Sequence, residues 1–307
     1  MMTEPLQRFS GVTHPDLIEE KGSKNMVTRD ALDANLHLRY AIDASNAGSR
    51  YLAYAELKTA EYLGADPTEI GELLHAFEQA LPDPLTMAHN QYFRFISLSS
   101  EIMDRAGGTT LSVLDVGGGD GQLAAFLPGA LYCLAEPKVN GISGTDLPFA
   151  ERSFDYVACC HVLEHIPPDK RSLFLDQLLS KARCGLVLLN PFHLENTHVE
   201  ERLKLFIEVT NAEWAQEHLD CSLPRIHDVQ DYANARGLEI SIKPNGTLTT
   251  TMAFVFIDHF AARAGCYDDW RKINVFFNGK CTSILDSPQY PNSYLIYIGR
   301  PAPKSNS

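Results

Sequence analysis

The sequence predicts an α/β protein with a doubly wound, seven-stranded and mostly parallel sheet, a helical N-terminal region and a cap insertion. Short apolar runs alternate with helical segments through the second half of the 307-residue chain. Strands that are apolar throughout indicate a parallel sheet covered by helices on both faces. One such run also ends directly in a glycine-rich turn, as the first strand of a ligand-binding α/β sheet does.

The first third of the chain predicts an arm followed by helices. Residues 1–26 are polar and interrupted by prolines and glycines, which predicts a flexible arm. Residues 27–106 space their apolar side chains at helical intervals and are expected to form a helical cap region. Within it, Asp66 and Pro67 predict a helix start, because an aspartate accepts from unpaired amide groups and proline fits the first turn.

Residues 107–301 are expected to form one domain, with a substrate lid inserted at about 193–285. The seven expected strands are 111–116, 131–136, 142–145, 154–160, 185–190, 238–243 and 293–298. Helices are expected at 120–126, 168–183 and 227–236, which would connect consecutive strands.

Composition narrows the possible partners. Lys and Arg total 26 against 39 Asp and Glu, a formal net charge of −13, and the basic residues are scattered. Such a surface repels a phosphate backbone, so we expect no nucleic-acid partner.

Seven cysteines, an odd number with no CxxC pair, indicate reduced thiols. The N-terminus has no apolar stretch after a basic start, and the apolar segment 251–265 is too short to cross a bilayer. We therefore expect a cytoplasmic protein without a membrane span.

The stretch VLDVGGGDGQL, which begins at residue 113, predicts a ligand site. Gly117 and Gly119 let a ligand approach the main chain closely. Asp115, at the strand end, can fix the turn or receive a cationic group through water. A dinucleotide fingerprint would need a glycine where Gln122 stands. Asp115 and Asp120 flank the turn, and their negative charge disfavours a pyrophosphate and favours a sulfonium or ammonium ligand.

Two further acids follow the next two expected strands. Glu136 ends the second strand, where a carboxylate can bind both hydroxyls of a ribose. Asp146 follows the third strand and could accept from an adenine amine, with Leu147 against the ring. Three acids at three successive strand ends predict an adenosine site.

These motifs carry a family resemblance. VLDVGGGDGQL, EP, GTDLPFAERSFDYVACCHVLEHIPP and GLVLLNPF resemble the successive motifs of class I S-adenosylmethionine-dependent methyltransferases over residues 110–192. The third motif resembles the branch that acts mainly on small molecules, sugars and quinones. A fainter resemblance after Phe192, to bacterial methyltransferases of surface-polysaccharide pathways, suggests a glycan-related acceptor.

The resemblance implies a Rossmann-like methyltransferase fold, S-adenosylmethionine as cofactor and S-adenosylhomocysteine as product. It places the glycines under the methionyl part, Glu136 on the ribose, and Cys160 and His161 beside the methionine and its methyl group. The residues implied are Gly117, Gly118, Gly119, Glu136, Pro137, Asp146, Leu147, Cys160 and His161.

Methyl transfer is an in-line displacement that needs alignment and, for a hydroxyl acceptor, a base. The candidate bases are His161, His165 and His193, which follow the fourth and fifth strands. His165 could equally be structural, and His161 could simply contact the cofactor. We expect O-methylation of a small-molecule or glycan-related acceptor. The alternatives are a C- or N-methyltransferase and a non-catalytic assembly partner.

Three further features remain open in the sequence. His193, Glu195 and His198 do not share a helical face as metalloprotease ligands do, so we expect no metal. Arg94 could bind the cofactor carboxylate, bind an acidic substrate or lie on a solvated helix face. The aromatic residues between 251 and 277 either line an apolar pocket or bury a contact in a homodimer.

Overall fold

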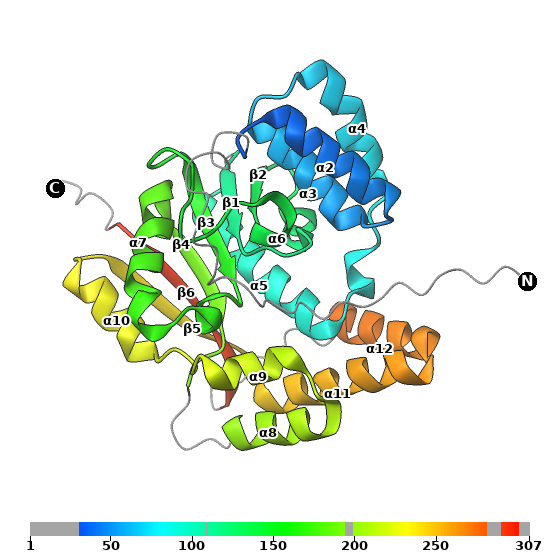
Figure 1. Cartoon of the computed structure of the whole chain (residues 1–307), viewed down its shortest axis with the longest axis vertical. Helices are drawn as coiled ribbons and strands as arrows, with labels where there is room; N and C mark the ends of the chain where they lie inside the picture. The colour runs from blue at the N-terminus through cyan, green and yellow to red at the C-terminus, as the bar shows by residue number, and fades with distance from the viewer. Residues whose placement is uncertain (1–30, 109, 194–198, 281–289, 301–307) are drawn as a thin grey trace, which may run out of the picture.

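The fold was analysed in a computed structural model that describes residues 31–108, 110–193, 199–280 and 290–300. The expected flexible arm, residues 1–26, lies outside the described residues. A mixed sheet forms the centre of the molecule, with helices on both faces and further helices gathered at one end (Figure 1).

The described residues form one six-stranded sheet in the order β2-β1-β3-β4-β6-β5. Its strands are β1 (Ser112–Val116), β2 (Leu131–Ala135), β3 (Phe154–Cys160), β4 (Ala182–Asn190), β5 (Glu239–Thr247) and β6 (Pro291–Gly299). The pairs β1–β2, β1–β3 and β3–β4 are parallel, whereas β6 runs antiparallel to β4 and β5. The predicted doubly wound, mostly parallel sheet is confirmed.

The short strand expected at 142–145 is absent, because local hydrogen bonds fold this segment into turns. The amide of Asp146 donates to the carbonyl of Ser143 at 3.0 Å. The amide of Ile142 donates to the side chain of Asn140 at 3.4 Å. The described sheet therefore has six strands, and β2 is one of its two edge strands.

A helix takes the place of the missing neighbour of β2. The N-terminal region contains α2 (Ala34–Asn46), α3 (Arg50–Tyr62), α4 (Pro67–Gln79) and α5 (His89–Ala106). On the outer edge of β2, the Leu134 amide donates to the hydroxyl of Thr59 on α3 at 2.9 Å, and the Leu134 carbonyl accepts from the Asn140 amide at 2.9 Å. Both groups that a further strand would have paired are thus satisfied.

The start of α4 confirms the prediction made for Asp66 and Pro67. The Asp66 side chain accepts from the Thr68 amide at 2.8 Å, and Pro67 is the first helical residue.

The two faces of the sheet carry separate cores. Leu114 and Val116 of β1 pack with residues of α7 (Arg171–Lys181) and α10 (Ile226–Ala235). Val113 faces the other way and packs with residues of α3 and α5. This alternation along one strand is what a sheet covered on both faces requires. The helix expected at 120–126 is a 3-10 turn, η2 (Gln122–Phe126), and that expected at 168–183 divides into η4 (Pro168–Lys170) and α7.

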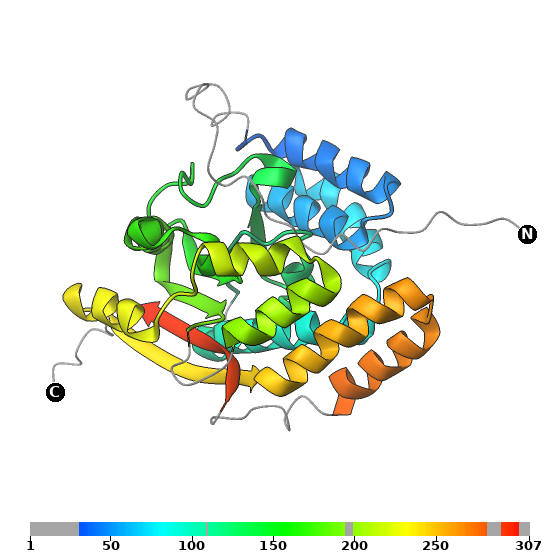
Figure 2. The ribbon, with the colours of Figure 1, turned by 60° about the horizontal axis from the view of Figure 1, so that its bottom comes forward.

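Four helices form the end of the molecule that lies beyond β5 and β6, as Figure 2 shows. They are α8 (Val199–Thr210), α9 (Glu213–Asp220), α11 (Leu248–Ala264) and α12 (Tyr267–Lys280). The region 193–285, expected as a lid insertion, also contains α10 and β5, which belong to the sheet domain. Among the residues that the structure describes, no helix combines the length and apolar character needed to cross a bilayer.

Candidate active site

The glycine turn after β1 leaves no room for side chains. Gly117 has a φ of +73°, and a Cβ there would overlap the side chain of Val162. A Cβ on Gly118 would overlap the carboxylate of Asp115. The Gly117 amide donates to the carbonyl of Ala135 at the end of β2, at 2.8 Å. The turn is therefore a bare backbone surface, held tightly between two neighbouring strand ends.

Asp115 lies beneath this turn with only 1% of its surface exposed. One carboxylate oxygen accepts from the Tyr132 hydroxyl at 2.6 Å, and within the described structure the other has no hydrogen-bond partner. Burial raises the pKa of Asp115 to about 7, and the charge of Glu136 adds to that shift. The geometry supports the first of the two roles expected for Asp115, that of fixing the turn. Its action on a cationic ligand stays a prediction.

Glu136 is held in place before any ligand arrives. It precedes the short helix α6 (Pro137–Asn140) and is 1% exposed. Its Oε2 accepts from the Gly119 amide at 3.1 Å, and its Oε1 accepts from the Lys138 amide at 3.3 Å. A carboxylate fixed by two backbone donors at the end of β2 is preorganised to receive hydroxyl groups.

A pocket opens beside the turn and this carboxylate. It is lined by Val116, Gly117, Glu136, Pro137, Gly144, Thr145, Val162, His165, Ile166 and Phe174. Apolar side chains form most of this set, with one carboxylate among them. A bare glycine cradle, a fixed carboxylate and apolar walls fit the ribose and adenine of S-adenosylmethionine.

The two residues expected around the adenine, Asp146 and Leu147, lie in different environments, and neither lines the pocket. Asp146 is exposed on the turn next to Thr145. Leu147 is 5% exposed, belongs to the main core and does not line the pocket. Gly144 and Thr145, for which no role was expected, occupy that wall instead. Both residues lie in the turn that the chain forms where a strand was expected.

His161 follows β3 in a conformation that is rare for residues with a side chain. Its φ is +56°, and its amide donates to the carbonyl of Leu189 on β4 at 2.8 Å. Its Nδ1 lies 3.0 Å from Oε1 of Glu164, while in the described structure its buried Nε2 has no hydrogen-bond partner. Backbone strain of this kind persists only where the surroundings hold it, often at functional sites.

The charge state of this pair follows from its surroundings. Burial, together with the charge of Arg94, lowers the pKa of His161 to about 4, although Glu164 acts to raise it. Glu164 is fully buried and accepts from the side-chain amide of Asn190. Burial acts to raise the pKa of Glu164, but the hydrogen bond and charge of His161 hold it below its usual range. At neutral pH the pair is a neutral imidazole beside a carboxylate.

Helix α9 brings two more groups to this pair. His165 Nδ1 lies 3.4 Å from Oε2 of Glu217, and His218 Nε2 lies 3.8 Å from Oε1 of Glu164. Donor atoms of Glu164, His165 and His218 lie within 4.8 Å of one another. Ion pairs between buried imidazoles and carboxylates also produce this spacing, so we do not identify them as metal ligands. Nothing local in the sequence indicated His218.

The remaining candidate base lies apart. His193 follows β4, and its amide donates to the carbonyl of Pro224 at 2.8 Å. No hydrogen bond or ion pair joins its side chain to His161 or His165 in the described structure. Glu195 and His198, the other members of the metal alternative, lie outside the described residues.

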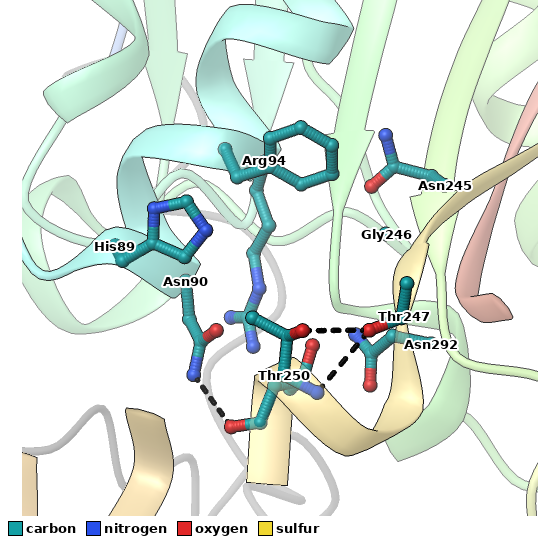
Figure 3. A pocket seen from close by; sticks show the side chains of 10 residues that line it. His89, Asn90, Arg94, Asn245, Gly246, Thr247, Thr250 and Asn292 are labelled. Carbon is teal, nitrogen blue, oxygen red and sulfur yellow. Dashed lines mark hydrogen bonds between the residues drawn. The ribbon is translucent and has the colours of Figure 1, made fainter. Parts of the chain in front are cut away.

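Cys160 and Arg94 are the last two residues that were expected at the cofactor site. Cys160 ends β3, and burial raises the pKa of its thiol to about 12, against the opposing charge of Arg94. Arg94 lies on α5 and lines a second pocket, at the ends of β5 and β6 (Figure 3). This pocket has no lining residue in common with the pocket beside the glycine turn.

Comparisons with known proteins agree with this geometry. Residues 62–241 match a family model described as a methyltransferase domain. A search of the curated proteins finds no match.

Solved structures that resemble the chain are distant. The YcgJ protein of Bacillus subtilis is 14% identical with a TM-score of 0.39, covering 66% of this chain and 99% of that one. A putative antibiotic-biosynthesis methyltransferase of Anabaena variabilis is 12% identical with a TM-score of 0.45, covering 67% and 97%. The plantazolicin methyltransferase BpumL, solved with S-adenosylhomocysteine, is 11% identical with a TM-score of 0.43, covering 87% and 100%.

The assignment depends on the family match and on the site rather than on these distant likenesses. The match covers more than half of the chain and includes β1, the glycine turn, Glu136 and the His161–Glu164 pair. The chain therefore belongs to the methyltransferase domain family and is a methyltransferase that uses S-adenosylmethionine.

Proposed function

We propose that the methyl group is transferred to a hydroxyl oxygen of a small molecule, with His161 as the general base. The observation that carries this proposal is the state of the His161 ring. Its Nδ1 faces a buried carboxylate, while its Nε2 is buried and, in the described structure, has no partner. A base needs a ring nitrogen of this kind, oriented and available.

The chemistry follows from that arrangement. Bound S-adenosylmethionine supplies a methyl group on a sulfonium sulfur. As the bond from the acceptor oxygen to the methyl carbon forms and the carbon–sulfur bond breaks, the hydroxyl proton passes to Nε2 of His161. The carboxylate of Glu164, whose Oε1 lies 3.0 Å from Nδ1, stabilises the imidazolium that forms through its negative charge. Because the pKa of free His161 is lowered, the ring is unprotonated at neutral pH.

The acceptor is proposed to be a hydroxylated small molecule, glycan-derived molecules included. The second pocket supports this, because amides and hydroxyls of Asn90, Asn245, Thr247, Thr250 and Asn292 line it. Such groups hydrogen-bond to hydroxyls in either direction. The net charge of −13 agrees with an acceptor other than a nucleic acid.

An acceptor screen tests the proposal. Sugars, phenols and hydroxy acids are compared with amines, with release of S-adenosylhomocysteine as the signal and the methylated atom identified by nuclear magnetic resonance. We expect turnover with hydroxyl compounds and an O-methyl product. A product methylated on nitrogen or carbon would show that the alternative reaction is correct, and S-adenosylhomocysteine binding without turnover would favour the assembly partner.

The base is tested with His161→Gln, with His193→Gln as the matched control. Loss of a general base is expected to lower kcat by roughly 100-fold or more, with S-adenosylhomocysteine affinity nearly unchanged. His193→Gln should behave like the natural protein, because its side chain makes no described contact with the pair. If turnover by His161→Gln stays within a few-fold of the natural protein, His161 is not the base.

A further inference from the structure

The pocket around Arg94, which we call the Arg94 pocket, joins segments that are far apart in the chain. Its walls are the first turns of α5, the end of β5, the start of α11 and the start of β6. Its polar lining residues are His89, Asn90, Arg94, Asn245, Thr247, Thr250, Thr251 and Asn292. None of the described lining residues carries a negative charge, so Arg94 is the charged group of the pocket.

The Arg94 guanidinium has no hydrogen bond or ion pair within the described structure. Figure 3 shows its side chain extending between Asn90 and Thr250. The carboxylates of Glu164 and Asp258 act on it from beyond ion-pair distance. Asp258 instead accepts from the indole of Trp270 at 2.6 Å. Arg94 is half-buried, and a partly desolvated guanidinium without a direct partner is costly, so an entering anion would relieve that cost.

The other walls favour an anion as well. The side chain of Thr247 accepts from the Thr250 amide at 3.2 Å and so caps the N-terminus of α11, a helix of 17 residues. Asn90 donates to the carbonyl of Thr251 at 3.1 Å, which fixes its amide at the rim (Figure 3). The positive end of a helix dipole, an arginine and side-chain amides therefore converge on one space.

Helix α5, which carries Arg94, also contacts β3, the strand that His161 follows. The charge of Arg94 acts on Cys160, His161 and Glu164, at the end of β3 and just beyond it. A ligand held by Arg94 would therefore extend toward the same strand end as His161. The cofactor pocket lies on the other side, against β1 and β2.

We propose that the Arg94 pocket binds an anionic oxygen group of the acceptor, a carboxylate or a phosphate. The hydroxyl to be methylated then lies on the part of the acceptor that reaches His161. This inference rests on the proposed function for the identity of the ligand as an acceptor, but not on which residue is the base. Arg94 is the residue that selects acidic acceptors over neutral ones.

The test uses the full chain saturated with S-adenosylhomocysteine. Inorganic phosphate and acetate are titrated separately by calorimetry into the natural protein, Arg94→Gln and Arg263→Gln. Arg263, exposed near the other end of α11, is the matched control. We expect millimolar binding of at least one anion, weakened about tenfold or more by Arg94→Gln, as for loss of a charge-assisted hydrogen-bond pair. Arg263→Gln should bind it unchanged, and the preferred anion indicates whether the group is a phosphate or a carboxylate.

The same variants separate this proposal from its rival. The affinity of Arg94→Gln for S-adenosylhomocysteine is measured first, and we expect it to stay close to that of the natural protein. A tenfold loss would assign Arg94 to the cofactor carboxylate and overturn the proposal. Absence of anion binding to the natural protein at millimolar concentration would also overturn it. His161→Gln, which leaves this pocket intact, tests the proposed base separately.

Thermal melting shows whether Arg94→Gln is folded. If it is not, Arg94→Lys is measured in its place, because it keeps the charge and loses the two-pronged geometry of the guanidinium. We expect it to bind the anion several-fold more weakly. Unchanged anion binding by a folded Arg94→Lys would contradict a direct contact by the guanidinium.

Discussion

The two ends of the site are built in different ways. The cofactor end comes mainly from one stretch of chain, since Asp115, Gly117 and Glu136 lie on two consecutive strands and the turn between them. At the proposed acceptor end, Arg94 and Asn292 line one pocket and His161 follows β3, so these residues come from three distant segments. A site made by neighbouring residues leaves a readable pattern, whereas one made by distant residues is visible only after folding.

The two ends also differ in charge. Buried carboxylates, Asp115 and Glu136, surround the glycine turn. Arg94 is the charged lining residue described at the other pocket. This division suits a cationic sulfonium at one end and an anionic acceptor at the other.

The largest effect that we predict at the cofactor end concerns Asp115. Its pKa is raised from 3.8 to about 7, so the folded protein binds this proton more tightly than the unfolded chain does. The resulting stability is complete below about pH 4 and is lost as pH rises through about 7, by about 4 kcal/mol in all. Asp115→Asn removes the titration, so relative to the natural protein it should gain stability between pH 4 and pH 8.

Urea unfolding of both proteins at those two pH values measures the effect. Other titrating groups cancel, because they are shared. A difference in unfolding free energy that is equal at both pH values would show that Asp115 does not titrate in this range and would weaken the contrast between the two ends.

The next largest effect is predicted for Gly117→Ala. A methyl group at φ +73° is strained by about 1 kcal/mol or more and displaces Val162 at the pocket wall. We expect S-adenosylhomocysteine affinity to fall about 100-fold by calorimetry, which corresponds to about 2.7 kcal/mol. Gly71→Ala is the control, since an added methyl there meets no atom within 4 Å. Normal binding by Gly117→Ala would mean that the turn is not the cradle.

Much of the fold could be predicted because its signals are local. The strands β1 to β4 and β6 each contain an apolar run, and Asp66 with Pro67 marks a helix start. The strand expected at 142–145 does not form beside β2. The hydroxyl of Thr59, 75 residues away in the sequence, accepts from the Leu134 amide at that edge. No short-range pattern carries that contact.

The candidate site also contains residues that local patterns predict and residues that only the fold brings together. The glycines and Glu136 could be found from spacing along the chain, and Gly117 and Glu136 line one pocket in the structure. His218 reaches Glu164 only because α9 folds back onto the segment after β3. Asn292 meets Arg94 only through the position of β6 in the sheet. Neither belongs to a motif.

A smaller effect is expected for Glu136→Ala. The variant removes the carboxylate that holds the Gly119 amide and lines the pocket. Loss of a charge-assisted hydrogen-bond pair should weaken S-adenosylhomocysteine about tenfold or more in the same titration. Glu151→Ala, an exposed glutamate outside the pocket, should leave binding unchanged. Equal affinities for both variants would remove Glu136 from the cofactor site.

The smallest effect is predicted for the double variant His165→Gln/His193→Gln. His165 is turned toward Glu217 and the cofactor pocket, and no described contact links His193 to the pair formed by His161 and Glu164. Turnover by the double variant should therefore fall by far less than the roughly 100-fold loss that follows removal of a general base. A large loss of kcat with unchanged S-adenosylhomocysteine binding would move the base away from His161. If turnover persists, neither His165 nor His193 removes the acceptor proton, and of the three candidate histidines only His161 remains.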